Sequence, residues 1–153
     1  IAGRNYANYT VLRNGEFAYN KGNSDRFPQG CIYRLDEYEI GAVPNVFYSF
    51  RFDPAVTVCG FFVQLFKMGY QNKQLRAYIN SGVRNDGLLN LNAKDFFKMK
   101  VPLPVIEEQQ EVADFFGDQD KEITLQQTKL KQLKQQKKGL MQQLLTGKVR
   151  VKV

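Results

Sequence analysis

The chain has 153 residues, 13% of them aromatic, and its 22 Lys and Arg against 15 Asp and Glu give a formal net charge of +7. This length suits one globular domain with an appendage, or two very small units, and excludes a large multidomain enzyme. The aromatic content excludes a disordered or collagen-like chain, and no apolar run reaches the roughly 18 residues that span a bilayer. We therefore expect a soluble protein, and its basic charge favours a polyanionic partner, although charge alone supports that idea only weakly.

Histidine is absent, and Cys31 and Cys59 are the only cysteines. The chain by itself therefore cannot assemble a Cys/His zinc site, a Ser/His/Asp triad or a Cys/His dyad. We expect no catalytic residue, no metal site and no cofactor. Two isolated thiols fit a reducing cytoplasm, with both as small core or surface residues. Because the sequence begins at Ile1 rather than methionine, we also expect a fragment or a processed product.

Three strands are predicted in the first part of the chain, over 15–20, 31–35 and 46–52. The first two alternate apolar residues with small or polar ones, and the third is rich in β-forming residues. The segment 21–30 between the first two strands combines Gly, Asn, Ser and Pro, which predicts an exposed loop.

A helix is predicted after Asp53-Pro54, because proline is favoured at the first helical position. An apolar stripe follows at helical spacing and is expected to belong to the core; it consists of Phe61, Phe62, Leu65 and Phe66.

The segment 81–87 predicts a second glycine-bounded loop, followed by a strand over 88–91. Asn92 is then typical of the N-cap of a short helix, with Asp95 in its first turn. Together these elements predict a small mixed α+β fold.

Composition changes near residue 101. Residues 1–101 hold ten of the twelve Phe, all eight Tyr and nine of the twelve Gly, whereas 105–146 is rich in Gln, Lys, Leu and Glu and contains no proline. The Val-Pro-Leu-Pro run between the two parts cannot continue a helix. We therefore predict a globular domain over 1–101, a proline hinge over 102–105, and a long helix with a basic tail over 106–153.

The long helix carries a coiled-coil seam, because ten positions spaced by three and four from residue 112 include seven apolar residues. At about 1.5 Å per residue the helix would be about 60 Å long, too long for the globular domain to cover, so a partner helix is expected. Lys137 occupies an a position, where a polar group can fix register. The predicted dimer interface comprises Val112, Phe116, Ile123, Leu130, Leu133, Lys137, Leu140 and Leu144.

The charges of this helix predict the direction of its partner. Residues 107–122 carry seven carboxylates and one lysine, whereas 123–153 carry eight basic groups and no acid. Two parallel copies would align like charges, while an antiparallel pair aligns opposite ones. We expect an antiparallel homodimer; the alternative is a solvated charge gradient that stabilises a single helix.

Four groups of motifs follow one another along the chain. They are Gly-Glu-Phe-Ala-Tyr-Asn-Lys-Gly-Asn-Ser at 15–24, Gly-Val-Arg at 82–84 with Gly-Leu-Leu-Asn-Leu at 87–91, Pro-Leu-Pro at 102–104 with Glu-Glu-Gln-Gln at 107–110, and 133–134 with 138–147. In these motifs the chain resembles the specificity (S) subunit of type I restriction-modification enzymes. The resemblance covers nearly the whole length, and the order of the motifs makes it specific.

The resemblance implies a target recognition domain followed by a conserved helix that pairs antiparallel with a second one. In this family each recognition domain reads one half of a split DNA target, the helices set the gap, and methyltransferase and restriction subunits supply the chemistry. The chain is similar to one such unit, the C-terminal half judging by its ending, so two copies would mimic one subunit. The family's recognition domain is usually longer, which predicts that part of it is absent.

Sequence-specific DNA reading needs hydrogen-bond donors and acceptors on exposed loops. It also needs basic side chains that contact the phosphates. Two predicted loops and one further polar stretch supply them; for each residue the alternative is an ordinary turn residue or a solvated charge. The predicted DNA-binding residues are Lys21, Asn23, Ser24, Arg26, Lys73, Arg76, Arg84 and Asn85.

The leading hypothesis is a non-catalytic DNA recognition module whose partners are double-stranded DNA, the methyltransferase subunit and, through it, the restriction subunit. A coiled-coil scaffold with a protein-binding head is the alternative. A DNA-modifying enzyme is disfavoured, because the sequence has no Asn/Asp-Pro-Pro-aromatic motif and no glycine-rich cofactor loop.

Overall fold

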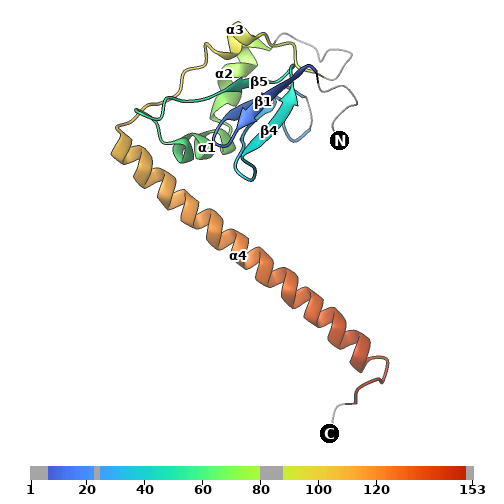
Figure 1. Cartoon of the computed structure of the whole chain (residues 1–153). Helices are drawn as coiled ribbons and strands as arrows, with labels where there is room; N and C mark the ends of the chain where they lie inside the picture. Colours follow the sequence, from blue (N-terminus) through green and yellow to red (C-terminus); the bar gives the residue numbers. More distant parts are fainter. Residues whose placement is uncertain (1–6, 23–24, 80–87, 151–153) are drawn as a thin grey trace. The chain divides into compact units, whose positions relative to one another are not determined.

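The computed structural model describes residues 7–22, 25–79 and 88–150 (Figure 1). The chain forms two compact units, Ile1–Ala113 and Asp114–Val153. The first, called the head below, contains two small antiparallel sheets and short helices, and it includes the first two turns of the long helix. The second unit is the rest of that helix with the chain that follows it.

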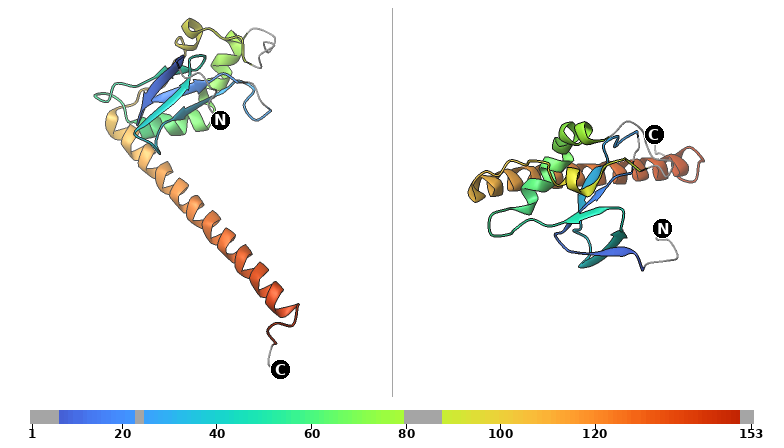
Figure 2. Two further views of the ribbon diagram at one scale, coloured as in Figure 1. Left: turned by 45° about the vertical axis from the view of Figure 1, so that its right-hand side comes forward. Right: turned by 90° about the horizontal axis from the view of Figure 1, so that it is seen from above.

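The head contains two separate antiparallel sheets. One pairs β1 (Tyr9–Arg13) with β4 (Ile40–Pro44), and the other has the order β3 (Cys31–Arg34), β2 (Phe17–Asn20), β5 (Tyr48–Phe50). Within the head, the β1–β4 ribbon lies on the side away from α2 (Figure 2). The three-stranded sheet supplies Phe17, Tyr19 and Ile32 to the buried core cluster.

Three short helices complete the head: α1 (Cys59–Lys67), α2 (Tyr70–Tyr78) and α3 (Ala93–Phe96). Gly69 connects α1 to α2 with a φ of +79°, a left-handed conformation that glycine adopts without the steric cost of a Cβ atom.

Aromatic rings dominate the core of the head. Phe62 of α1 stacks on Phe52 with 4.0 Å between ring centroids, and Phe96 of α3 stacks on Tyr19 with 4.6 Å between theirs. The buried cluster consists of Phe17, Tyr19, Ile32, Phe62, Leu65, Phe66, Leu75, Leu91 and Phe96. Burial of these rings and aliphatic side chains joins the three-stranded sheet to all three short helices.

The predicted α+β class is confirmed, and each of the three predicted strands contains an observed one with tighter bounds. Strands β1 and β4 were missed. The β1–β4 ribbon leaves Val11 and Ile40 exposed, and β4 contains Gly41 and ends at Pro44, so neither strand shows the clean alternation of a half-buried strand.

The helix predicted at Asp53-Pro54 begins later, at Cys59. The Asp53 Oδ1 atom accepts a hydrogen bond from the Ala55 amide at 2.9 Å, and the Thr57 hydroxyl donates to the Asp53 carbonyl. These bonds hold a turn in place of a first helical turn. The predicted apolar stripe is confirmed as core, because three of its four side chains are buried and Phe61 packs against them.

The segments around the second predicted loop are partly as expected. The loop 81–87 lies outside the described residues, and the predicted strand at 88–91 is reduced to an isolated bridge between Gly22 and Leu88. The N-cap at Asn92 is confirmed, because its Oδ1 atom accepts from the Asp95 amide at 2.8 Å.

The long helix α4 spans Ile106–Leu144, which confirms the predicted helix. Beyond Ala113 its apolar side chains Phe116, Ile123, Leu130, Leu133, Leu140 and Leu144 are exposed in the single chain. Whether a partner helix covers this seam stays a prediction, as do the domain boundaries. None of the described helices combines the length and apolar character needed to cross a membrane.

Candidate nucleic-acid interface

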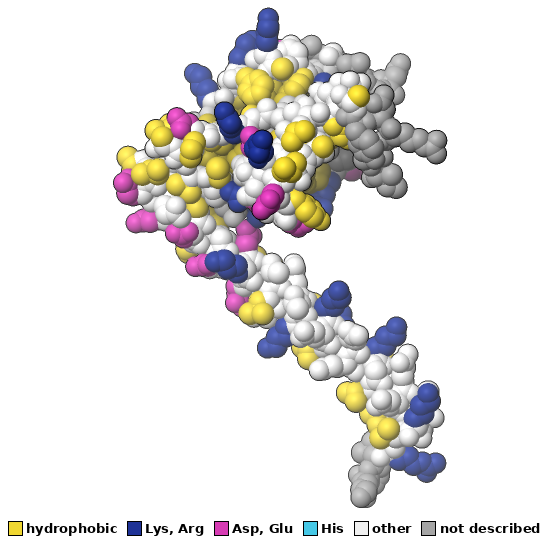
Figure 3. All heavy atoms as spheres, in the orientation of Figure 1, with side chains coloured by type: hydrophobic (Ala, Val, Ile, Leu, Met, Phe, Trp, Pro, Cys, Tyr) yellow, Lys and Arg dark blue, Asp and Glu magenta, His cyan; other side chains and the backbone are white. Residues whose placement is uncertain are grey.

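Five exposed cationic side chains lie on α2, on α3 and on the segment just after α3, and we call them the α2–α3 basic group: Lys73, Arg76, Lys94, Lys98 and Lys100. The sequences 70–79 and 88–100 contain one acid, Asp95, against these five cations. Figure 3 shows Lys and Arg side chains at the top of the head, where Figure 1 labels α3. An excess of positive charge of this kind suits a phosphate backbone.

Two hydrogen bonds hold α2 against the chain that follows α3. The Gln74 Nε2 atom donates to the Lys100 carbonyl at 2.8 Å, and the Lys100 amide donates to the Gln74 Oε1 atom at 3.0 Å. In addition, the Lys98 ammonium lies 5.7 Å from the centroid of the Tyr78 ring, at the end of α2. The cations of α2 and those near α3 are therefore kept on neighbouring segments.

Asp95 and Lys98 form an exposed ion pair with 2.7 Å between Oδ1 and Nζ. This hydrogen bond lowers the pKa of Asp95 and raises the pKa of Lys98. Both groups are therefore charged at neutral pH, and the basic group keeps a surplus of four positive charges over its one acid.

Tyr48 of β5 links the segments that flank the two predicted reading loops. Its hydroxyl donates to the Leu91 carbonyl at 2.5 Å, and the Lys21 ammonium lies 3.4 Å from the same hydroxyl. The Leu89 amide donates to the Lys21 carbonyl at 2.8 Å, next to the Gly22–Leu88 bridge. The start of the first loop and the start of the chain after the second loop therefore lie side by side.

An exposed aromatic side chain stands next to Tyr48 and the basic group. Phe97, at the end of α3, is 57% exposed and lies 6.4 Å from the Tyr48 ring and 6.3 Å from the Phe50 ring. An exposed ring flanked by lysines can pack on a sugar or a base. No separate sequence pattern marks Phe97, because it directly follows another phenylalanine, Phe96.

The described residues among the predicted DNA contacts fall into two groups. Lys73, Arg76 and Arg26 are exposed, and the Arg26 guanidinium lies 5.2 Å from the centroid of the Phe27 ring. Lys21 is buried instead, because its ammonium lies against the Tyr48 ring and hydroxyl. The loop 21–30 is therefore exposed in its middle and buried at its ends, Lys21 and Gly30.

The other four predicted contacts, Asn23, Ser24, Arg84 and Asn85, lie outside the described residues. Sequence analysis missed Lys94, Lys98 and Lys100, although the run of three lysines in seven residues after Asn92 is a charge signal. The helix cap at Asn92 explains the position of these residues in the fold but does not indicate that their lysines lie on a segment next to α2.

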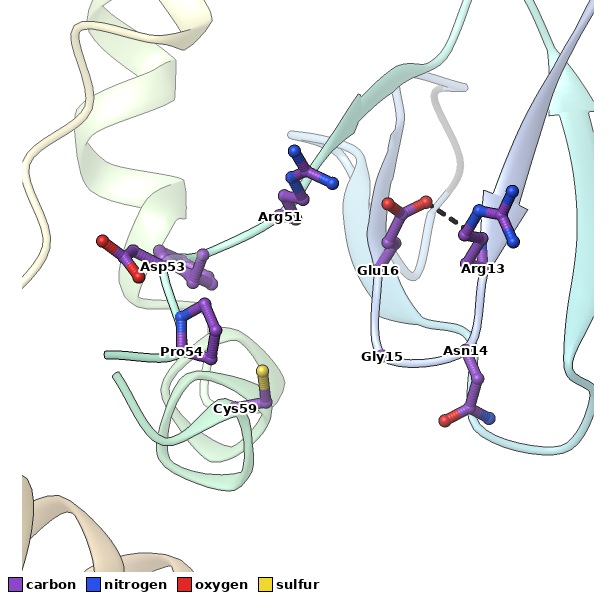
Figure 4. Close-up of a pocket in the computed structure, with 9 residues that line it drawn as sticks. Arg13, Asn14, Gly15, Glu16, Arg51, Asp53, Pro54 and Cys59 are labelled. Carbon is purple, nitrogen blue, oxygen red and sulfur yellow. Dashed lines mark hydrogen bonds between the residues drawn. The ribbon is translucent and has the colours of Figure 1, made fainter. Parts of the chain in front are cut away.

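A second feature of the head is an open cleft of about 750 Å³ between the β1–β2 turn and the chain that follows β5 (Figure 4). Arg13 and Glu16 line one side and Arg51 and Asp53 the other, so the formal charges of the cleft cancel. The Glu16 Oε2 atom accepts from the Arg13 amide at 2.9 Å. Guanidinium donors and carboxylate acceptors are groups that hydrogen-bond to base edges, but the balanced charge does not favour a phosphate.

Within residues 7–22, 25–79 and 88–150, no three Cys, Asp or Glu side chains come together in a way that could hold a metal ion.

Just under half of the chain is similar to a known protein family. Residues 61–135 match the family described as "Type I restriction modification DNA specificity domain". The matched region contains the whole α2–α3 basic group, the proline hinge and most of α4, and it confirms the resemblance found in the sequence motifs.

Two curated relatives of this specificity domain come from Methanocaldococcus jannaschii. The MjaVIII type I restriction enzyme specificity subunit is 31% identical over 77 residues, which are 50% of this chain and 18% of the relative. The MjaX specificity subunit is 39% identical over 62 residues, 40% of this chain and 15% of the relative. The chain thus matches less than a fifth of the length of either relative.

Proposed function

We propose that the chain is part of a DNA recognition module of a type I restriction-modification system and reads one half of a bipartite target. The observation that carries this proposal is the α2–α3 basic group, which lies entirely within the residues that match the specificity domain family. The names of the relatives, both specificity subunits, support the same role.

Lys73, Arg76 and the three lysines around α3 would contact backbone phosphates and set the register on the duplex. The loops that begin near Lys21 and end near Leu88 would read base edges, with Asn23, Ser24, Arg84 and Asn85 as the proposed donors and acceptors. The buried Lys21 would not contact DNA directly. It would instead help to position the loop, because its ammonium contacts the ring and hydroxyl of Tyr48. Arg26 remains a proposed direct contact.

The module would have no catalytic activity and need no cofactor. Its partners would be double-stranded DNA and a methyltransferase subunit, with a restriction subunit recruited through the latter, all in the cytoplasm. In two antiparallel copies, α4 would serve as the spacer between two heads, and the exposed seam from Phe116 to Leu144 would be the dimer interface.

The proposal is tested by measuring binding of the purified chain to a random duplex pool at several salt concentrations. We expect an affinity that falls steeply with salt, and removal of two phosphate contacts in Lys73→Ala/Arg76→Ala should reduce the magnitude of the logarithmic salt slope by about 2. The double variant Lys129→Ala/Lys131→Ala on α4 removes the same charge and is the control.

A shallow salt slope with weak binding, unchanged in Lys73→Ala/Arg76→Ala, would contradict the proposal. That outcome would favour the scaffold alternative, in which the exposed seam assembles proteins and the head binds a protein.

A further inference from the structure

Gln109, in the first turn of α4, is a fully buried polar side chain in a helix that is otherwise mostly exposed. Its amide group makes three hydrogen bonds to the backbone of the head. The Oε1 atom accepts from the Val58 amide at 2.8 Å, and the Nε2 atom donates to the carbonyls of Pro104 at 2.8 Å and Val56 at 3.1 Å. These bonds join α4 to the proline hinge and to the chain that enters α1.

Close packing one turn further along α4 supports the same joint. Ala113 is buried, and a Cβ atom added to Gly60 of α1 would lie 3.0 Å from the Ala113 Cβ. Real Cβ atoms are rarely this close, so α1 and the start of α4 approach each other at a distance that only glycine permits. All of these residues lie within the compact unit Ile1–Ala113.

The chemistry of the pocket around Gln109 requires an amide. One backbone N–H and two backbone carbonyls meet the fully buried Gln109 amide in partly buried hydrogen bonds and need an acceptor and two donors. Leaving a buried polar group unpaired costs about 1–3 kcal/mol. A carboxylate supplies no donor, an aliphatic side chain supplies neither, and asparagine is one methylene shorter.

We propose that Gln109, together with Gly60 and Ala113, is the positioning element that fixes the start of α4 in the head and so passes the spacing set by the helix to the residues that read DNA. The joint itself follows from the contacts of the head alone. Its effect on spacing rests on the proposed function.

The joint is tested first without DNA, by pulsed electron spin resonance on the full chain with spin labels at Met68→Cys after α1 and Glu111→Cys at the start of α4, both within the unit Ile1–Ala113, after Cys31→Ala and Cys59→Ala. Labelled chain is diluted with unlabelled chain so that each distance is measured within one molecule. We expect a narrow distance distribution that becomes at least about twice as wide in Gln109→Ala, because removing the amide frees the first turn. Gln132→Ala, an exposed glutamine of the same helix, is the control.

Three further variants test the joint if Gln109→Ala folds poorly. Gly60→Ala should shift the distribution, and Gly60→Ala/Ala113→Gly should restore it, because the second change removes the opposing Cβ. Gln109→Glu should give a wide distribution at about pH 8 that narrows toward about pH 5, because only the protonated acid can donate to a carbonyl. Equal widths in all variants would overturn the joint.

The effect on DNA is tested with duplexes that carry a selected target with its gap lengthened or shortened by one base pair. We expect the wild-type chain to prefer the native gap by about tenfold and Gln109→Ala to prefer it less than about threefold, with similar affinity for an isolated half-site. Full gap preference in Gln109→Ala would overturn the role in spacing. Failure of the wild-type chain to bind any duplex would instead contradict the proposed function, and the spin-label result would stand by itself.

Discussion

Tyr19 closes the loop after β2 over the core of the head. Its side chain is fully buried, its ring stacks on Phe96, and its hydroxyl donates to the Gln29 carbonyl at 2.8 Å. Gly30, with a φ of +72°, lies against this hydroxyl: a Cβ at Gly30 would be 2.7 Å from it and 2.5 Å from the Asn20 carbonyl oxygen. The start and end of the segment 20–30 are thus fixed by one tyrosine and one glycine.

Gly30 and Gly15 form a matched pair for separating crowding from backbone strain. Both have positive φ, but a Cβ at Gly15 meets nothing within 4 Å. We expect Gly15→Ala to lower the free energy of unfolding by about 1 kcal/mol, from the left-handed conformation alone. Gly30→Ala should lower it by about 3 kcal/mol or more, because backbone and a buried ring must move as well. Equal losses in urea titrations would show that the contacts around Gly30 do not matter.

The pH dependence of stability should report on Tyr19. Burial raises the pKa of this phenol, with smaller contributions from Tyr48 and Cys31. The folded state therefore favours the protonated form, and its contribution to stability is complete below the unfolded pKa of about 10 and is lost as pH rises above it.

Urea titrations between about pH 9 and pH 11 test this in the wild type and in Tyr19→Phe. The wild type should lose up to about 1.4 kcal/mol more per pH unit than the variant. At neutral pH, Tyr19→Phe should be less stable by about 1–2 kcal/mol, because the Gln29 carbonyl loses its donor. Parallel pH profiles would mean that Tyr19 ionises equally easily in both states.

At the scale of elements, α4 has two different parts. Its first two turns contain the only buried side chains of the helix, Gln109 and Ala113, and belong to the head. The remainder exposes an apolar seam at heptad spacing, and near the end of the helix Leu133, Lys137, Leu140 and Leu144 line a shallow groove. A continuous apolar seam on an isolated helix favours a partner, because water contact with it is unfavourable.

The seam is tested by Leu130→Glu/Leu133→Glu. These charges would lie in the dimer interface, so we expect the sedimentation mass to fall from that of two chains to that of one. Thr128→Glu/Gln135→Glu adds the same charge on the opposite face of the helix and should leave the mass unchanged. A monomeric wild type, or an unchanged mass in the leucine variant, would contradict the predicted interface.

The direction of pairing is tested by charge reversal. Changing Glu107, Glu108 and Glu111 to Lys should weaken an antiparallel dimer about tenfold or more, because the start of each helix would lose its acidic excess and place three lysines opposite the partner's basic end. Adding Lys131→Glu, Lys134→Glu and Lys138→Glu should restore the affinity, since the two ends become complementary again. Dissociation constants from dilution series measure both effects, and an unaffected triple variant would argue against antiparallel pairing.

Local sequence patterns predicted the elements whose cause is local. The Asn92 cap, the stripe at 61–66 and the three central strands follow from side-chain spacing. The β1–β4 ribbon was missed because its stability depends on pairing between strands that are far apart in sequence, with Arg13 opposite Ile40 and Tyr9 opposite Pro44. The burial of Gln109 was also missed, because its three partners lie in segments that only the fold brings together.

At the scale of the whole molecule, the candidate interface was predictable only in part. Lys73, Arg76 and Arg26 were found as charges in polar stretches, and they are exposed as expected. The burial of Lys21 under Tyr48 and the approach of Lys98 and Lys100 to α2 depend on long-range packing that spacing does not reveal. The motifs predicted the similarity to type I specificity domains, while the structure showed which cations lie on neighbouring segments.

The most direct measurement is selection of binding sites from a random duplex library by the full chain. Because the proposed dimer has two identical heads related by a twofold axis, we predict a consensus of two inverted copies of one short sequence. They should be separated by a constant gap of at most roughly 18 base pairs, the length of a helix of about 60 Å on B-DNA. A library that yields no enriched sequence, or a single unpaired site, would contradict the account.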